Sequence, residues 1–474
     1  MGSFCGWCGV HSGPDTPQQT IDRMLDDCRG STATDCTTNC GERGAIGVCE
    51  GLYTTSHYLG DGIRVVITGS PIWDDRAVAE IAKQHGDAAA LARAYRDYGK
   101  DLLARLHGPF ALAVLDGDTA LVAIDRIGIH SLSYARGDGV FVFSTSTGSV
   151  ARHPKITRQI DPQAIFNYVY FYDIPSPGTV YRNVGKLLPA QYVHYRNGAL
   201  EKGFYWQLHY GDNKRASFQS KRRELHDILR QCVASSASGG PVATFLSGGT
   251  DSSTVTGFLA ELQDESVDTY SIGFGAEGFD EMEYARLAAK RYAASAHEYY
   301  LKPDDVLESI PLIAGTYDEP FANESAVPTY FCARQAARDG VRIMLAGDGG
   351  DEIFGGNERY AKQLVFEHYD RVPRFLRKGL VEPIAGGIPG GEAIMPVRKL
   401  RSYIRQASIP LPERMESYNF IYRQPLGEMF HPDFISTVDP DMPAAMLREV
   451  YASADAGHTV NRMLHLDMKF TLAD

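Results

Sequence analysis

The stretch Ser247-Gly248-Gly249-Thr250-Asp251-Ser252-Ser253 combines the residue types of an anion-binding turn. It follows a β-prone run at 242–246 and precedes apolar residues that recur at helical spacing. A glycine turn between strand and helix directs backbone N–H groups at an anion, and the helix dipole favours the negative charge. Because Asp251 would repel a bare phosphate, the turn predicts a phosphate site bridged by Mg²⁺. The structural alternative is a serine-rich turn with a helix N-cap at Thr250 or Asp251.

A second glycine-rich turn at 347–356 follows another strand-like run and places Asp348, Asp351 and Glu352 close together in the sequence. Carboxylates this close repel one another unless a cation or a positively charged ligand neutralises them. We therefore expect Asp351 to provide a second phosphate and magnesium contact opposite Asp251.

The two turns together resemble the synthetase domain of the asparagine synthetase family, which carries SGGxDSS followed by SGxGxDExFGGY. The first turn resembles the signature of the ATP pyrophosphatase, or PP-loop, superfamily, whose members cleave ATP between the α and β phosphates. It is not a Walker loop, because no Lys follows its glycines. Residues 270–274, 317–321 and 327–330 resemble further segments of the same domain, and the resemblance covers most of 205–361.

The resemblance implies ATP as a substrate and Mg²⁺ as its metal. It implies that ATP and pyrophosphate contact Leu246, Ser247, Gly248, Gly249, Asp251, Ser252, Ser253, Ile272 and Gly347. Asp251 and Asp351 would hold the metal, and with Asp348 they form the expected catalytic set. Asp348 lies where asparagine synthetases place a catalytic acid, whereas β-lactam-forming relatives carry Tyr there.

Two acidic side chains also have structural interpretations, since Asp348 and Glu352 could cap the following helix or pair with Arg359. For Glu352 we favour that interpretation, and for Asp348 a role in deprotonating the attacking amine. Asp318-Glu319 lies in the segment that shapes the acyl pocket in relatives. Nearby, Asn323-Glu324-Ser325 replaces the Asp-(Ser/Pro)-Ser that is common in relatives, which argues against aspartate as the acyl substrate.

The first half of the chain predicts a β-rich layered domain. Runs rich in β-branched and aromatic residues predict strands at 64–68, 110–115, 120–124 and 140–144, and helical patterns lie at 76–83 and 87–103. Segments 106–111 and 125–128 resemble motifs of the class II glutamine amidotransferase domain, which precedes the synthetase domain in the family. The resemblance implies an N-terminal nucleophile (Ntn)-type αββα sandwich.

The second half alternates strand and helix patterns and predicts an α/β domain with a mainly parallel sheet flanked by helices, similar to the adenine-nucleotide α-hydrolase fold. The expected elements are strands 241–246, 267–274 and 341–346 and helices 250–262, 280–292 and 325–339. Ligands in such sheets bind at the carboxyl ends of the strands, where both glycine-rich turns lie.

We divide the chain into an amidotransferase-like domain at 1–172, a junction at 173–215 and a synthetase domain at 216–474. In relatives, the helix that resembles the chain's last residues leads into a loop with a Lys that stabilises adenylation. We therefore expect the synthetase domain to be incomplete at its C-terminus and to turn over weakly or not at all.

Cys5 is the candidate glutaminase nucleophile, but its position does not suit the reaction. In glutamine-hydrolysing relatives, a Cys directly after the initiator Met uses its own α-amine as the base. The family's Asn-Gly-Glu triplet, which supplies the oxyanion donor and grips glutamine, corresponds here to Thr68-Gly69-Ser70. We expect a retained scaffold with an inactive glutaminase site; the alternative is activity after processing to Cys5 or Cys8.

Six of the eight cysteines lie in the first 49 residues. The spacings of Cys5-x-x-Cys8 and Cys36-x-x-x-Cys40 suit a zinc site, but we expect free thiols in a reducing cytoplasm. Cys232 and Cys332 fall in helical patterns, where we expect them to be buried.

The net charge and the lengths of the apolar runs limit the classes of partner that the chain could bind. A net charge of −12 argues against nucleic acid and anionic membranes, and no apolar run reaches transmembrane length. No secretory signal is visible, so we expect a cytoplasmic protein. The expected partners are a small-molecule or peptide carboxylate substrate and, in a homodimer, a second copy of the chain.

The family resemblance implies an ATP-dependent ligase that forms an amide through a carboxylate adenylate and releases AMP and pyrophosphate. An inactive glutaminase domain is typical of family members that use an internal amine, such as β-lactam synthetases and lasso-peptide cyclases. We therefore favour a peptide or amino-acid-derived carboxylate. The alternatives are an asparagine synthetase that uses aspartate with ammonia or glutamine, and a non-catalytic nucleotide-binding scaffold.

Overall fold

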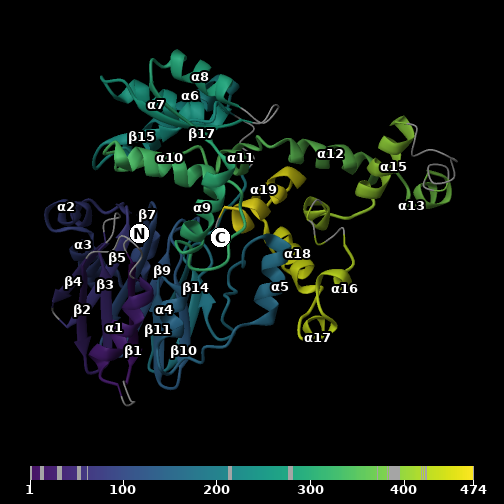
Figure 1. Cartoon of the computed structure of the whole chain (residues 1–474). Helices are drawn as coiled ribbons and strands as arrows, with labels where there is room; N and C mark the ends of the chain where they lie inside the picture. Colours follow the sequence, from purple (N-terminus) through teal and green to yellow (C-terminus); the bar gives the residue numbers. More distant parts are fainter. Residues whose placement is uncertain are drawn as a thin grey trace. The chain divides into compact units, whose positions relative to one another are not determined.

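The computed structural model describes residues 3–10, 15–28, 35–50, 55–60, 62–211, 216–275, 281–370, 372–381, 383, 395–417, 419, 421 and 424–472. Its contacts define two compact units (Figure 1). Unit 1 contains Met1–Tyr210, Asp318–Pro320 and Gly355–Asp474, and unit 2 contains Gly211–Tyr317 and Phe321–Phe354. The sequence-based domain limits stay a prediction, and residues 212–215 of the expected junction lie outside the described residues.

Two six-stranded antiparallel sheets form the centre of unit 1. The first sheet has the order β12-β10-β11-β1-β3-β2, with bounds Gly185–Lys186, Ser133–Gly137, Val140–Ser144, Ser3–Gly9, Gly44–Cys49 and Cys36–Gly41. The second has the order β14-β13-β9-β8-β5-β4, with bounds Ala199–Phe204, Gln191–Arg196, Thr119–Ile124, Phe110–Asp116, Ile63–Gly69 and Thr55–Gly60. Their facing sides share one apolar core that contains Phe141, Val122 and Val193.

Helices cover the outer faces of both sheets (Figure 1). The first sheet packs against α1 (Pro17–Cys28) and α4 (Thr147–Ala151), and the second against α3 (Asp87–Tyr98), which packs beside α2 (Arg76–His85). A 3₁₀ helix η1 (Gly99–Arg105) follows α3, and β6 (Ile72–Trp73) pairs with β7 (Leu106–His107). These four layers confirm the predicted αββα sandwich.

The helices after residue 355 also belong to unit 1, and several of them pack on α5 (Pro162–Phe171). Phe166 and Tyr170 of α5 share an apolar cluster with Met415, Leu447 and Met463. The bounds in this region are α12 Glu358–Asp370, α13 Arg374–Leu376, η2 Arg377–Val381, α15 Met395–Ala407, η3 Glu413–Glu416, α16 Leu426–Met429, α17 Pro432–Ile435, α18 Met442–Ser453 and α19 Thr459–Phe470. None of the described helices is long and apolar enough to cross a membrane.

Unit 2 contains a four-stranded parallel sheet in the order β17-β16-β15-β18, which confirms the predicted fold class. Its strands are Ser295–Leu301, Asp268–Phe274, Val242–Phe245 and Ile343–Leu345 in that order. Alternate residues of β15 face opposite layers: Val242 packs with α6 and α7, and Ala243 packs with α10. The helices are α6 Phe218–Ser236, α7 Thr250–Leu262, α8 Met282–Arg291, α9 Pro303–Ala314, α10 Ala326–Arg338 and α11 Gly350–Phe354.

Two expectations about cysteines are wrong. Cys36 and Cys49 form a disulfide, because the antiparallel register of β2 and β3 places them directly opposite each other. Cys232 is exposed rather than buried, because α6 presents it to solvent, whereas Cys332 is buried as expected. Among the described residues, no group of three His, Cys, Asp or Glu side chains could hold a metal, so the zinc alternative finds no support there.

Replacing Phe141 by Ala should lower the free energy of unfolding of unit 1 by about 3–5 kcal/mol. The ring is fully buried and stacks on Tyr195 of the opposite sheet, with centroids 5.4 Å apart. All three tryptophans lie in unit 1, so Trp fluorescence during urea unfolding follows this unit. The control is Leu59→Ala on β4, which is 46% exposed and should cost under about 0.5 kcal/mol. Equal losses for the two variants would contradict the described core.

Candidate active site

The turn between β15 and α7 is held by its own serines. The Ser247 hydroxyl lies 3.0 Å from the Ser252 hydroxyl, and the amide of Gly249 donates to Ser247 Oγ at 3.2 Å. Helix α7 begins at Thr250 with Gly249 as its N-cap and no side-chain cap. The alternative that Thr250 or Asp251 caps the helix is therefore wrong, and the first turn of α7 presents its amides to the strand end.

Glycine is required where this turn passes α8. Gly248 adopts φ +85°, a conformation that other residues rarely take, and its backbone lies against Ala285 and Tyr284. A Cβ at Gly248 would lie 2.5 Å from the Tyr284 Cβ and closer still to the Ala285 amide nitrogen. The turn can therefore keep its shape only without a side chain at this position.

The second turn lies directly beside the first, because β15 and β18 are parallel neighbours whose carboxyl ends share one edge of the sheet. A Cβ on Gly347 would lie 2.7 Å from the Ser252 amide, and one on Gly350 would lie 2.5 Å from Asp251 Cγ. The structure thus brings together the two glycine-rich turns that the sequence singled out.

Asp351 lies close enough to Asp251 to influence the charge of the Asp251 carboxyl. Burial raises the pKa of the Asp251 carboxyl, and the neighbouring charge of Asp351 raises it further. Two carboxylates at one edge fit a cation that also takes phosphate oxygens, which is the usual way in which Mg²⁺ binds with a nucleotide. The donor set therefore suits Mg²⁺, although its presence remains a prediction.

The other predicted site residues surround these turns in unit 2. Leu246 is 2% exposed at the end of β15, Ser253 is half-buried in the first turn of α7, and Ile272 is half-buried on β16. Asp348 is exposed on the second turn. Arg359, the suggested structural partner of Asp348 and Glu352, forms an ion pair with Asp467 of unit 1. The individual catalytic roles stay predictions.

Both the synthetase part and the amidotransferase-like part of the sequence match known protein families. Residues 224–474 match the asparagine synthase family, and residues 76–206 match the glutamine amidotransferase domain. The chain belongs to the asparagine synthase family. The family resemblance inferred from the two turns is therefore confirmed.

Individual relatives in the asparagine synthase family are longer than this chain. It is 31% identical over 301 residues to a Methanocaldococcus jannaschii protein provisionally named glutamine-hydrolyzing asparagine synthetase 2, covering 61% of this chain and 58% of the relative. It is 26% identical over 392 residues to the Bacillus subtilis glutamine-hydrolyzing asparagine synthetase 1, covering 81% of this chain and 59% of the relative. The chain thus spans less than two thirds of the length of these relatives.

The amidotransferase half of this family member lacks the surroundings of a reactive thiol. Cys5 is fully buried in β1, and burial raises the pKa of its thiol well above the ordinary value, with a further rise from Cys28. A protonated and shielded thiol is a poor nucleophile. At the end of β5, the hydroxyl of Thr68 accepts a hydrogen bond from the Thr55 hydroxyl at 3.1 Å, and no Asn or Glu stands in the triplet. These features support an inactive glutaminase site.

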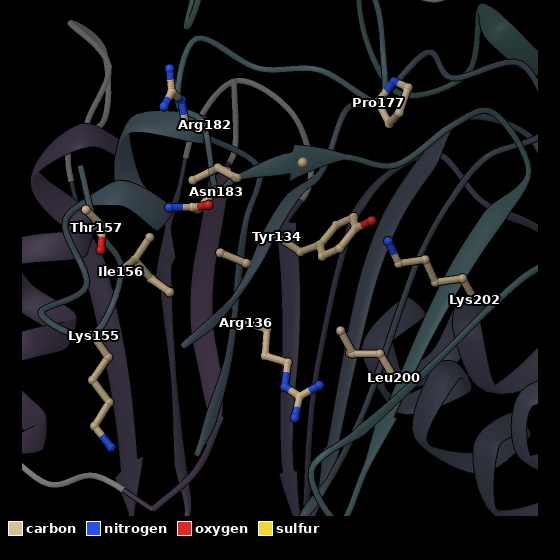
Figure 2. Close-up of a pocket in the computed structure, with 13 residues that line it drawn as sticks. Tyr134, Arg136, Lys155, Ile156, Thr157, Pro177, Arg182, Asn183, Leu200 and Lys202 are labelled. Carbon is tan, nitrogen blue, oxygen red and sulfur yellow. The ribbon is translucent and has the colours of Figure 1, made fainter. Parts of the chain in front are cut away.

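A cavity of about 510 Å³ lies elsewhere in unit 1 (Figure 2). Its wall carries four cationic side chains, namely Arg136, Lys155, Arg182 and Lys202. Figure 2 shows the Lys202 side chain directed toward Tyr134, and the Lys202 Nζ lies 4.9 Å from the Tyr134 ring centre. None of the predicted site residues lines this cavity, so it is separate from the candidate active site.

Cys5 should resist alkylation in the folded protein, because its thiol is buried and its pKa is raised. Iodoacetamide labelling near the ordinary pKa of a free thiol, followed by peptide mass spectrometry, measures this directly. Cys232 is exposed and serves as the internal control that should react first. Cys5 should reach the Cys232 rate only in urea; equal rates in the folded protein would contradict the buried site.

Gly248→Ala should weaken the binding of Mg²⁺-ATP by about tenfold or more. The left-handed backbone costs a residue with a side chain about 1–2 kcal/mol, and the new Cβ would displace the turn from α8. Calorimetric titration with Mg²⁺-ATP gives the dissociation constant. Gly315→Ala is the matched control, because Gly315 has φ −78° at the end of α9 and should leave the affinity unchanged. Equal affinities for both variants would show that the turn does not hold the nucleotide.

Proposed function

We propose that this chain carries the ATP-dependent amide ligase chemistry of its family. A carboxylate oxygen attacks the α-phosphorus of ATP, the bond to the β-phosphate oxygen breaks, and pyrophosphate leaves. An amine then attacks the carbonyl carbon of the adenylate and loses a proton, and AMP leaves. The observation that supports this best is the meeting of the two glycine-rich turns, with Asp251 beside Asp351, at the carboxyl edge of the sheet.

Each turn has a role in this proposal. The amides of Gly248 and Gly249 and the hydroxyls of Ser247 and Ser252 would donate hydrogen bonds to the phosphates. Asp251 and Asp351 would hold Mg²⁺, which neutralises the charge of the leaving pyrophosphate when bound. Asp348 is exposed on the same turn as Asp351, where it can accept the proton of the attacking amine.

A peptide or amino-acid-derived carboxylate with its own amine is the substrate class that we propose. The buried Cys5 and the replacement of the Asn-Gly-Glu triplet by Thr68-Gly69-Ser70 argue against release of ammonia from glutamine. The names of the relatives favour a second candidate, the formation of asparagine from aspartate and ammonia. A homodimer and a cytoplasmic location remain predictions.

Asp251→Asn and Asp351→Asn should each lower pyrophosphate release by about 100-fold, because each removes a carboxylate that would hold the Mg²⁺ that neutralises the leaving group. The assay supplies Mg²⁺-ATP with either aspartate plus ammonia or peptides that carry a side-chain carboxylate and a free amine. Asp348→Asn should slow amide formation while leaving carboxylate-dependent exchange of pyrophosphate into ATP intact. Asp264→Asn, an exposed acid beyond α7, is the control that should change neither rate.

The product decides between the candidates. Formation of asparagine from aspartate and ammonia would reject the peptide-type substrate and support the second candidate. ATP binding without pyrophosphate release for any carboxylate, both in this chain and in a version extended through the Lys loop of the relatives, would contradict ligase activity and leave the nucleotide-binding scaffold.

A further inference from the structure

A short acidic segment of the synthetase half is bound by the amidotransferase-like half. Asp318–Pro320 belongs to unit 1, although the chain up to Tyr317 and from Phe321 belongs to unit 2. The segment lies between α9 and α10, and in relatives this part of the sequence shapes the acyl pocket. The sequence singled out Asp318 and Glu319 but gave no indication of their partners, which lie far away along the chain.

Asp318 binds the start of α4. Its Oδ1 accepts a hydrogen bond from the Ser146 hydroxyl at 2.7 Å, and its Oδ2 accepts one from the Thr147 amide. Ser146 is buried and is itself the N-cap of α4, since its hydroxyl accepts from the Ser149 amide. The carboxylate therefore binds an already rigid turn of the layered domain.

Glu319 forms a buried ion pair. Its Oε2 lies 3.1 Å from Lys186 Nζ, and the two side chains are only 10% and 11% exposed. Its Oε1 accepts from the Val180 amide at 2.6 Å, and Lys186 also donates to the Ile174 carbonyl at 2.7 Å. Both oxygens of the carboxylate are thus satisfied by the layered domain.

Burial has a cost that these partners offset only in part. Desolvation raises the pKa of the Glu319 carboxyl, and Lys186 and the Val180 amide oppose this rise without cancelling it. A buried ion pair with directional, charge-assisted hydrogen bonds does more to hold a chain segment in one position than to raise the free energy of unfolding. The pair therefore suits a contact that fixes one segment in one place.

We propose that the amidotransferase-like layers, without glutaminase chemistry, act as an anchor for the Asp318-Glu319 segment. Glu319 and Asp318 are positioning residues that hold the chain directly before residues 321–325, a segment that the family resemblance assigns to the acyl pocket. The link to the acyl pocket rests on the proposed function, whereas the anchoring itself does not. Anchoring would give the layered domain and its core a role although Cys5 is buried.

Hydrogen exchange of the full chain tests the anchor without any substrate. Lys186→Met and Glu319→Gln should each raise the exchange rate of peptides covering 321–325 by about tenfold, since each breaks the same charged contact. The double variant should exchange no faster than either single variant. Lys202→Met removes an exposed lysine of the same domain and should leave the rate unchanged.

Turnover separates positioning from simple loss of structure. In the pyrophosphate assay, the single variants should raise KM for the carboxylate that supports release and leave KM for Mg²⁺-ATP and kcat nearly unchanged. If no carboxylate supports release, the proposed function fails, and hydrogen exchange still decides whether the anchor exists.

Two results would overturn the proposal. One is exchange in Lys186→Met that matches Lys202→Met, and the other is an additive effect in the double variant. Trp fluorescence shows whether the layers stay folded. If Lys186→Met unfolds them, Ser146→Ala replaces it and should still raise exchange, because it removes the hydroxyl partner of Asp318. It also removes the side-chain cap of α4, so Trp fluorescence again checks that the layers stay folded. Unchanged exchange in Ser146→Ala would then reject the anchor.

Discussion

Close approach of two backbone turns is the constraint on which the candidate site depends. Gly350 lies where a Cβ would come within 2.5 Å of Asp251 Cγ, and Gly347 lies as tightly against Ser252. Only parallel neighbours such as β15 and β18 end at the same edge and can bring two turns into such contact. Helices pack on both faces of the central strand β15, with α6 and α7 on one face and α10 on the other, and this packing favours one position for the strand.

The amidotransferase-like half combines a packed core with a buried carboxylate that shapes one of its turns. Its core between the two sheets is complete, and Asp125 of the family motif is buried and accepts hydrogen bonds from the amides of Gly128 and His130. That carboxylate shapes a turn rather than a substrate site. Cys5 is buried, and Thr68-Gly69-Ser70 stands where the expected Asn-Gly-Glu triplet would lie.

The sequence predicted the elements whose local signals are strong. Helix 250–262 matches α7 and strand 110–115 matches β8, because a glycine turn or a run of β-branched and aromatic residues marks each one. By contrast, β17 at Ser295–Leu301 is polar and half-exposed, and α9 contains Pro311, so neither has a clear local pattern.

Contacts between distant parts of the sequence could not be predicted in this way. The Cys36–Cys49 disulfide depends on the register of β2 and β3, and β2 carries no apolar strand signal. The Lys186–Glu319 pair depends on how the chain returns to the first sheet after α9. Local sequence patterns predict the turns that form a site. The distant residues that contact a segment and fix its position are determined by tertiary packing.

Binding of Mn²⁺ with pyrophosphate, followed by electron paramagnetic resonance, tests most directly whether the two turns form one site. The account predicts that Asp251→Asn, Asp351→Asn and the double variant all lose the bound signal to the same extent, because both carboxylates serve one metal. Retention of the signal in either single variant, or losses that simply add, would show that the two turns act separately.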